Sequence, residues 1–554
     1  MPDTTDPKLL VCSASFACYL VYKYFEPNNL SAHVVLLLGV PALLVGRLSP
    51  QLSFLQQAGA VIFYWSLILV FTATYRLSPF HPLAKYPGPT LGKLSRIYVA
   101  YFNGRGDLHR VIRDWHDRYG DVVRIGPNEL SFCRADALQP IYVAKSMQKG
   151  PYYDTRTGLE NITTLDGVRD FSVHGARRKP WVKAMGISAL KGYEPILQTK
   201  ILELVEVLSK RQKETIDISH WMNLFGFDLI GHVAFGHEFG MLKAGEDDDG
   251  LMRRVEDGVY ATAVLSQTPW ILPFIRRLPP AVKAIRDMRH MGATLAQGRT
   301  KNGSASKDLF YFLTEDETAA ESGATLDEII ADGILALVAG SDTTATVLSH
   351  LCYFMLRHPE CAERLHKEID ATFPPGEDPL DFSRHADMPY LNACINETLR
   401  LLPAVLGGLQ RIVKRGSSGA TIGPHVVPEG TQVSVHTFSL HRDPREFAPL
   451  PDVFWPDRWL AQDTYVLPSG AAVDKAHVTT NRAAFVPFSV GPQNCAGRAL
   501  AMIEMRAVVC AVMHKFELRR AEEYDLDRWE RDVMDAYISL RGKLPVILEQ
   551  RQGR

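Results

Sequence analysis

The chain has 554 residues, with 61 Lys and Arg against 62 Asp and Glu, a formal net charge of −1 and 46% hydrophobic residues. A near-neutral chain has no overall positive field with which to hold nucleic acid, so we expect no nucleic-acid partner. Eight cysteines without a Cys-x-x-Cys pair exclude a disulfide-rich scaffold and a zinc module built on cysteine pairs.

Three apolar runs open the chain, at residues 9–22, 30–46 and 58–74, and no formal charge lies between Arg47 and Arg76. The third run is close to the roughly 20 residues that a helix needs to cross a hydrocarbon core. A cleaved signal peptide is the alternative for the first run, but two acids precede it, which is the wrong charge. We predict a membrane anchor over 1–78 with one to three transmembrane helices. Basic residues after the third run place the remainder in the cytosol.

A proline-rich segment, Tyr86-Pro87-Gly88-Pro89, follows the anchor and predicts a stiff hinge over 79–92, because proline fixes φ and denies helix. Residues 93–554 are expected to form one large domain. Helical periodicity dominates from about 107 to 402, short strands are predicted over 411–437, and a loop-rich stretch over 441–492 precedes a final helix over 496–516. One long helix is expected from the capping box at Thr325 and Glu328 to about Arg357. The predicted fold class is mainly α with a small β region.

The most informative segment, 488–497, has the pattern Phe-x-x-Gly-x-x-x-Cys-x-Gly and leads into a helix. Gly491 permits a tight turn, and Gly497 lets a flat body approach the backbone. Cys495 lies where unpaired helix amides favour the thiolate, which is a good ligand for heme iron. An inert buried cysteine is the ordinary alternative, but chance gives this pattern in only about one chain in five hundred.

Two further segments carry polar residues in apolar surroundings. The long helix contains Gly340, Asp342 and Thr343 at mid-length, and its flanks are too apolar for a solvated face. We predict that Gly340 leaves room for a bulky ligand, that the Thr343 hydroxyl turns away from the backbone to hold oxygen or water, and that Asp342 relays protons. Glu397 and Arg400 share one helix face, where an exposed ion pair would contribute little. Their apolar neighbours instead predict a buried pair, which needs a further partner; the candidate is Arg458.

These segments, in this order, resemble the cytochrome P450 family of heme-thiolate monooxygenases over residues 86–545. The resemblance implies the cytochrome P450 fold, heme b as the cofactor, Cys495 as its iron ligand, and Asp342 with Thr343 as the catalytic pair for proton delivery and O₂ activation. It implies a structural ion-pair triad of Glu397, Arg400 and Arg458. The residues expected to bind the heme are Cys495, His174, Arg178, Arg411, Phe488, Gly491, Gly497 and Gly340.

One position departs from the family pattern. Arg or His commonly stands two residues before the cysteine, and here it is Gln493. A neutral amide still donates a hydrogen bond but does not compensate a propionate charge, so we expect His174, Arg178 and Arg411 to carry more of the heme anchoring. Read without the resemblance, His174 and Arg178 would be part of a surface basic cluster.

The resemblance implies a membrane-bound enzyme of the endoplasmic reticulum that inserts one oxygen of O₂ into its substrate. The chain lacks a Rossmann fingerprint, a flavin-binding segment and iron–sulfur cysteine spacing, so electrons must come from a partner. The expected partner is NADPH–cytochrome P450 reductase, with cytochrome b5 as a second candidate, and the basic residues 177–179 with Lys183 are either a docking surface or simply solvated. Pocket segments implied by the resemblance contain no charge, which predicts a lipophilic substrate such as a terpenoid or a polycyclic aromatic secondary metabolite. These segments are 161–165, 335–339, 404–409 and 537–540.

Two other functions stay open. A family member can rearrange or dehydrate an oxidised substrate without O₂, although the intact pair of Asp342 and Thr343 argues against this. A non-enzymatic heme sensor is the other alternative, and it would need no proton relay.

Overall fold

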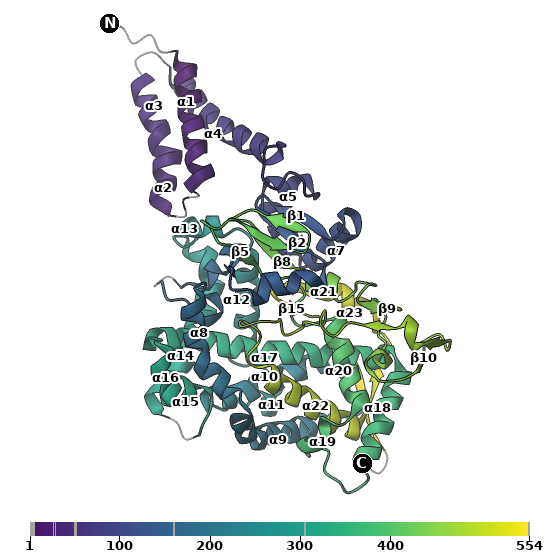
Figure 1. Cartoon of the computed structure of the whole chain (residues 1–554). Helices are drawn as coiled ribbons and strands as arrows, with labels where there is room; N and C mark the ends of the chain where they lie inside the picture. Colours follow the sequence, from purple (N-terminus) through teal and green to yellow (C-terminus); the bar gives the residue numbers. More distant parts are fainter. Residues whose placement is uncertain are drawn as a thin grey trace.

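The computed structural model describes residues 6–25, 27, 29–48, 53–158, 161–303 and 306–551. Its first three helical segments project from one end of the main body (Figure 1). They are α1 (Pro7–Phe25), a stretch made of α2 (Leu30–Val34), a π-helical turn (Val35–Gly39) and α3 (Val40–Leu48), and α4 (Phe54–Leu77). Of these, Leu30–Arg47 and Phe54–Leu77 are long and apolar enough to cross a membrane. The first predicted run forms α1, which does not meet that criterion among the described helices.

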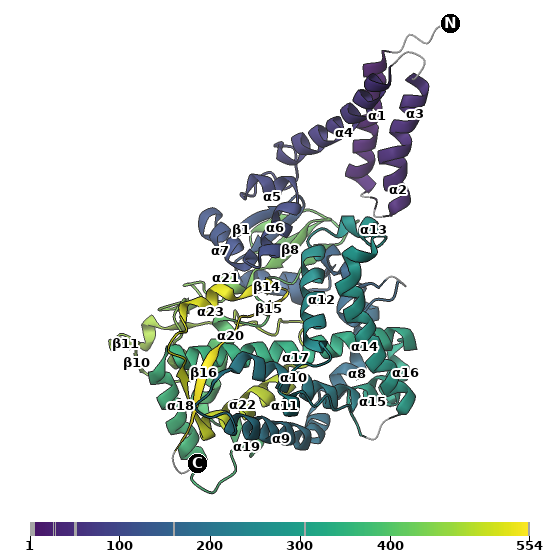
Figure 2. The ribbon, with the colours of Figure 1, turned by 180° about the vertical axis from the view of Figure 1, so that it is seen from behind.

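The three N-terminal segments pack on one another and touch the main body at α13 (Leu272–Ile275) and, through Arg76 of α4, at the Leu94 carbonyl of α5 (Thr90–Leu94). The rings of Phe16 and Phe71 meet edge to face at 5.4 Å, and the Tyr64 hydroxyl donates to the carbonyl of Leu36 at 2.8 Å. The ring of His33 lies 5.0 Å from that of Phe274 in α13, and both views place this end of the anchor beside α13 (Figures 1 and 2). The predicted hinge also contacts the body, because the Arg124 amide donates to the carbonyl of Pro87 at 2.7 Å.

The main body is mostly helical, as the predicted fold class requires. The remaining helices are α5 (Thr90–Leu94), α6 (Ile97–Arg105), α7 (Leu108–Tyr119), α8 (Phe171–Ala184), α9 (Ile187–Ser209), α10 (Ile218–Phe235), α11 (Met241–Ala244), α12 (Leu251–Ser266), α14 (Lys283–Asn302), α15 (Leu309–Thr314), α16 (Glu317–Ser322), α17 (Leu326–Arg357), α18 (Pro359–Thr372), α19 (Phe382–His385), α20 (Pro389–Leu401), α21 (Thr437–Leu440), α22 (Arg498–Lys515) and α23 (Asp527–Asp532).

Helix α17 is the centre of the main body. Its N-terminal capping box, formed by Thr325 and Glu328, is present, and the helix ends at Arg357, so this prediction is confirmed. It is long and apolar enough to cross a membrane, but 72% of its apolar window is buried inside the protein. It packs against α10, α14, α20 and α22, and Figure 1 shows it crossing the body beside α10 and α20. The final helix, predicted over 496–516, is α22.

The β structure is small and lies partly where helix was expected. The main sheet has the order β1-β2-β8-β5-β3, in which only β2 and β8 run parallel. Figures 1 and 2 show it on the side of the body nearest the anchor. The strands are β1 (Val122–Gly126), β2 (Glu129–Phe132), β3 (Met147–Lys149), β4 (Thr215–Asp217), β5 (Arg411–Val413), β6 (Ala420–Ile422), β7 (His425–Val427), β8 (Gln432–Val435), β9 (Phe447–Ala448), β10 (Thr464–Val466), β11 (Ala472–Asp474), β12 (Thr479–Thr480), β13 (Phe516–Arg520), β14 (Met534–Ala536), β15 (Ile538–Leu540) and β16 (Pro545–Gln550).

Helix dominates residues 107–402, as predicted, but the short strands β1 to β4 interrupt it, which the periodicity does not indicate. Every residue of β1 and β2 is buried, and although β2 alternates polar and apolar residues, runs of five and four residues are too short to establish a period of two. Such short buried runs cannot be told from helix by periodicity. Strand β3 is fixed by pairing with β5, more than 250 residues later, which no local pattern reveals.

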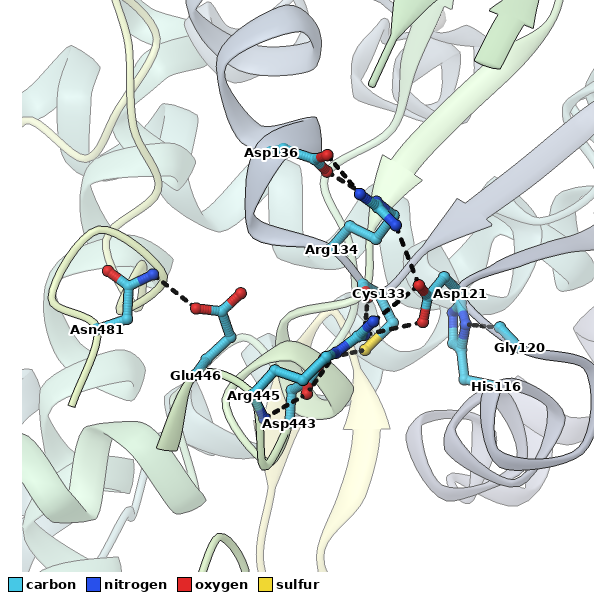
Figure 3. Close-up of polar contacts among 10 residues, drawn as sticks. All are labelled: His116, Gly120, Asp121, Cys133, Arg134, Asp136, Asp443, Arg445, Glu446 and Asn481. Carbon is cyan, nitrogen blue, oxygen red and sulfur yellow. Dashed lines mark hydrogen bonds and ion pairs between the residues drawn. The ribbon is translucent and has the colours of Figure 1, made fainter. Parts of the chain in front are cut away.

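A charged network joins this sheet to the segment after α21 (Figure 3). Arg445 binds both carboxylate oxygens of Asp121 at 2.8 Å and also contacts Asp443. Arg134 pairs with Asp121 at 3.2 Å and with Asp136 at 2.6 Å. Residues more than 300 positions apart are thus held together, which fixes the sheet against the loop-rich region.

Candidate functional site

A cavity of about 410 Å³ lies beneath α17 and is lined mainly by apolar side chains. Among the described residues, Cys495 is the only cysteine on its wall, and its accessible surface faces this cavity. No three His, Cys, Asp or Glu side chains gather into a metal site in the described part of the chain. A metal held here must therefore bring most of its ligands with it, as heme iron does. Apolar residues on the wall include Leu335, Ala339, Val347, Leu399, Phe488 and Leu500.

The loop before α22 holds Cys495 in place. The Cys495 amide donates to the carbonyl of Phe488 at 3.0 Å. Gly491 has φ of +81°, and a Cβ there would lie 2.3 Å from the carbonyl oxygen of Tyr142, so both its conformation and its surroundings require glycine. A Cβ on Gly497 would lie 4.0 Å from the Cys495 sulfur, so glycine leaves the space beside the sulfur open.

Two opposing effects act on the protonation of Cys495. Burial raises the pKa of the Cys495 thiol above its ordinary value, although the Gly497 amide, the charge of Arg178 and the Arg498 amide lower it. The helix amides therefore act in the predicted direction, towards the thiolate, but burial outweighs them. Coordination itself supplies the missing stabilisation, since a thiol that ligates a cation is deprotonated outright.

One side of the cavity is rich in basic side chains. This side is lined by the three residues predicted to anchor heme, which are His174 and Arg178 of α8 and Arg411 of β5. Lys149 of β3 lies with them. Arg178 donates to both the carbonyl and the side-chain oxygen of Asn494 at 2.8 Å, next to the cysteine. Burial and the neighbouring cations lower the pKa of Lys149 to about 7 and that of His174 to about 3. An anionic ligand would relieve this repulsion.

Gln493 also lines the cavity, and its buried side-chain nitrogen has no hydrogen-bond partner among the described residues. A buried donor without a partner is costly unless a ligand accepts its hydrogen bond. Together these features fit a heme with its two propionates. The features are the apolar walls, one cysteine sulfur, several cations and this free donor. Sequence reasoning missed Lys149, because a single lysine in a short strand carries no spacing signal.

The middle of α17 places Thr343 and Asp342 in different surroundings. Thr343 lines the cavity, but its hydroxyl donates to the Ala339 carbonyl at 2.8 Å, so the predicted turn away from the backbone is absent. This bond to the carbonyl four residues earlier is the usual one for a helical threonine. Asp342 is 1% exposed, and its Oδ1 lies 3.7 Å from Nη1 of Arg541. Burial raises the pKa of Asp342, whereas Arg541 opposes the rise.

Gly340 lines the cavity, yet its missing side chain faces another helix. A Cβ on Gly340 would lie 2.2 Å from Cδ1 of Ile230 in α10. The predicted reason for this glycine, room for a ligand, is therefore wrong. Glycine allows α10 and α17 to approach, and Ile230 itself then forms part of the wall.

Glu397 of α20 is fully buried and brings Arg400 and Arg458 together. Arg400 donates to its two oxygens at 2.7 and 2.8 Å, and Arg458 donates to Oε1 at 3.1 Å. The Glu397 carboxylate also accepts hydrogen bonds from the Trp455 amide at 3.0 Å and from the Trp459 indole at 2.9 Å. Burial alone would raise the pKa of Glu397, but Arg400 and Arg458 outweigh it and hold that pKa below its ordinary value. None of the three triad residues lines the cavity.

The basic residues proposed to dock a partner are already paired within the chain. Arg177 is buried and contacts Glu328 at 3.0 Å and Asp332 at 3.1 Å. Lys179 pairs with Glu321, and Lys183 pairs with Asp316 and Glu317 of the α16 region, at 2.9 to 3.1 Å. This run therefore offers little free positive charge, and its prediction as a docking surface is not supported.

The pocket segments expected from the sequence do reach the cavity, through Leu165, Leu335, Ala404 and Tyr537 among others. The expectation of an uncharged lining is wrong, however, because Arg156, Asp166 and Arg289 also form part of the wall. They come from outside the expected segments, and no local signal marks them.

A mainly helical body with one loop-held cysteine, facing a cavity of apolar walls and one cationic side, defines a heme-thiolate protein. A family model described as Cytochrome P450 matches residues 84–535. The cytochrome P450 monooxygenase FCK2 of Fusarium pseudograminearum is 33% identical over 488 residues, covering 87% of this chain and 85% of that protein. The cytochrome P450 monooxygenase phqL of Penicillium fellutanum is 31% identical, covering 85% of this chain and 81% of its own. A third relative is the cytochrome P450 monooxygenase nodW of Hypoxylon pulicicidum. It is 33% identical over 459 residues, covering 82% of this chain and 80% of that protein.

The chain belongs to the cytochrome P450 family. It is a cytochrome P450 monooxygenase, and heme bound through a cysteine thiolate is its cofactor.

Proposed function

We propose that this cytochrome P450 monooxygenase is anchored in the membrane of the endoplasmic reticulum, with its catalytic domain in the cytosol, and oxidises a lipophilic terpenoid or polycyclic aromatic substrate. The electrons come from NADPH through a membrane-bound flavoprotein reductase. The two apolar helices Leu30–Arg47 and Phe54–Leu77 support the anchor, and the largely apolar cavity supports a substrate that partitions into lipid.

The observation that carries the proposal is the position of Cys495, whose sulfur faces a largely apolar cavity with cations on one side. The heme held there supplies the reductive activation of O₂ and the insertion of one oxygen atom into the substrate. The protein positions the substrate against the apolar wall, excludes bulk water and delivers protons.

Protons pass from the carboxyl of Asp342 to the hydroxyl of Thr343. Burial favours the protonated form of Asp342, and Arg541 limits that preference, so the carboxyl can both hold and release a proton. Rotation of Thr343 about χ1 breaks its bond to the Ala339 carbonyl and turns the hydroxyl into the cavity. Arg541 is a positioning residue in this scheme, and it follows β15 rather than α17.

His174, Arg178 and Arg411 bind the propionates, with Lys149 and Gln493 as additional donors. Their common position on the cationic side of the cavity supports this assignment. Replacing Arg178 by alanine is then expected to weaken heme retention, and unchanged retention would count against the assignment.

The test is turnover by the purified full-length protein with reductase and NADPH under ¹⁸O₂, using a panel of terpenoid and polycyclic aromatic compounds. We expect one ¹⁸O atom in the product and NADPH consumption that depends on the added compound. A product formed without O₂ would favour rearrangement or dehydration, and a heme protein with no turnover would favour a sensor.

A further inference from the structure

Arg156 is a nine-tenths buried cation on the wall of a cavity whose lining is mainly apolar. It ends the 3₁₀ turn η5 (Pro151–Arg156) and is 9% exposed. Its Nε donates to Asp166 at 3.0 Å, and its Nη1 donates to the hydroxyls of Thr155 at 3.1 Å and Ser266 at 3.4 Å. In the described part of the chain, Nη2 has no hydrogen-bond partner.

Tyr537 lies against the same guanidinium. The centre of the Arg156 guanidinium is 4.9 Å from the centroid of the Tyr537 ring, and both residues line the cavity. The Tyr537 hydroxyl also lacks a hydrogen-bond partner among the described residues. Burial raises the pKa of Tyr537 well above its ordinary value, so this hydroxyl remains a proton donor.

The backbone holds Tyr537 in an unusual conformation. It is the single residue between β14 and β15, where Ala536 pairs with Ile538, and its φ is +72°. A bulky residue with positive φ is a genuine outlier, and such strain is characteristic of functional sites. The Tyr537 amide donates to Asp535 Oδ1 at 3.3 Å, which helps to hold the turn.

Resting on the proposed lipophilic substrate, we propose that Arg156 and Tyr537 form a polar subsite that binds a neutral carbonyl oxygen of the substrate. The Arg156 guanidinium provides donors only, and the Tyr537 hydroxyl provides one donor beside an oxygen that can accept. Asp166 already balances the charge of Arg156, and its other oxygen accepts from the Thr164 hydroxyl at 2.6 Å. A neutral acceptor therefore suits the subsite better than a carboxylate, which would be desolvated without a cation of its own.

The subsite can be tested by ligand binding, which needs neither reductase nor turnover. The dissociation constant is measured from the ligand-induced shift of the heme Soret band, with full-length holoprotein. The probes are two matched pairs, 9-fluorenone with fluorene and methyl dehydroabietate with dehydroabietane, in which only the first member carries a carbonyl. Dehydroabietic acid provides the carboxylate.

We expect the carbonyl compound of at least one pair to bind about tenfold more tightly than its hydrocarbon, as one well-placed hydrogen bond to a charged donor provides. Arg156→Lys keeps a charge for Asp166 but loses the planar fork, and it should remove this preference. Tyr537→Phe should reduce it without disturbing Asp166. The matched control is Arg276→Lys, because Arg276 donates to the carbonyls of Asp154 and Thr157 in the same loop but does not line the cavity.

Equal binding of carbonyl and hydrocarbon in both pairs would overturn the subsite, as would a preference that survives both Arg156→Lys and Tyr537→Phe. Tighter binding of dehydroabietic acid than of its methyl ester would overturn the inference that the subsite prefers a neutral carbonyl to a carboxylate. Any of these results leaves the proposed monooxygenase function standing, because that function is judged by ¹⁸O incorporation.

Discussion

Replacing Glu397 by glutamine is expected to destabilise the protein strongly without touching the cavity. The carboxylate is fully buried and accepts two hydrogen bonds from Arg400 and one each from Arg458, Trp455 and Trp459. Glutamine has the same shape but no charge, and its amide nitrogen would face donors. Two buried guanidinium groups would then lack a counter-charge, which costs about 3–5 kcal/mol. That is a large fraction of the roughly 5–15 kcal/mol by which proteins are stable.

The assay is urea unfolding of purified protein, followed by circular dichroism and by retention of the reduced, CO-bound heme band. The matched control is Glu363→Gln, which removes an exposed pair with Lys367 at 2.7 Å on α18. Such pairs contribute about 0–0.5 kcal/mol, so its unfolding midpoint should hardly move. If Glu397→Gln shifts the midpoint no more than Glu363→Gln does, the buried triad does not support the heme-binding core and the reasoning is refuted.

Three further predictions follow from the site and its surroundings. Gly491→Ala should prevent normal heme incorporation, measured as heme per protein, because its Cβ would lie 2.3 Å from the Tyr142 carbonyl at a φ of +81°; normal incorporation would contradict the close approach. Thr343→Ala should keep the CO-bound band but divert electrons to peroxide, and fully coupled oxidation would contradict the relay. Burial raises the pKa of Asp535 to about 6 from 3.8, so unfolded chains ionise first and stability should fall by about 3 kcal/mol as pH rises from about 4 to about 6. Asp535→Asn should make that fall in urea midpoints smaller but not remove it, because burial also raises the pKa of Asp332 to about 7 and that of Glu504 to about 8; an unchanged pH profile would show that other groups cause it.

The parts of this protein that local sequence determines could be predicted well. The extent of α17 follows from a capping box and a long apolar repeat, and Gly491 follows from a turn that needs positive φ. Glu397 and Arg400 could be paired because they lie three residues apart on one helix among apolar neighbours. Each of these features has its physical cause within a few residues.

The parts that depend on distant contacts could not be predicted. Lys149 and Arg156 reach the cavity from segments without a recognisable pattern, and Arg541 meets Asp342 across 199 positions of sequence. The sequence marks Gly340 but does not reveal the reason for it, because only the tertiary structure brings Ile230 against this position. The pairing of Lys179 with Glu321 likewise depends on how α8 and α16 pack.

The central claim, that Cys495 ligates heme iron in this cavity, is tested most directly by the visible spectrum of the reduced, CO-bound protein. A thiolate ligand gives a strongly red-shifted Soret band. We predict this band for the wild type and its loss in a folded Cys495→Ala variant. Absence of the band from folded, heme-loaded wild type, or its persistence in Cys495→Ala, would contradict the assignment.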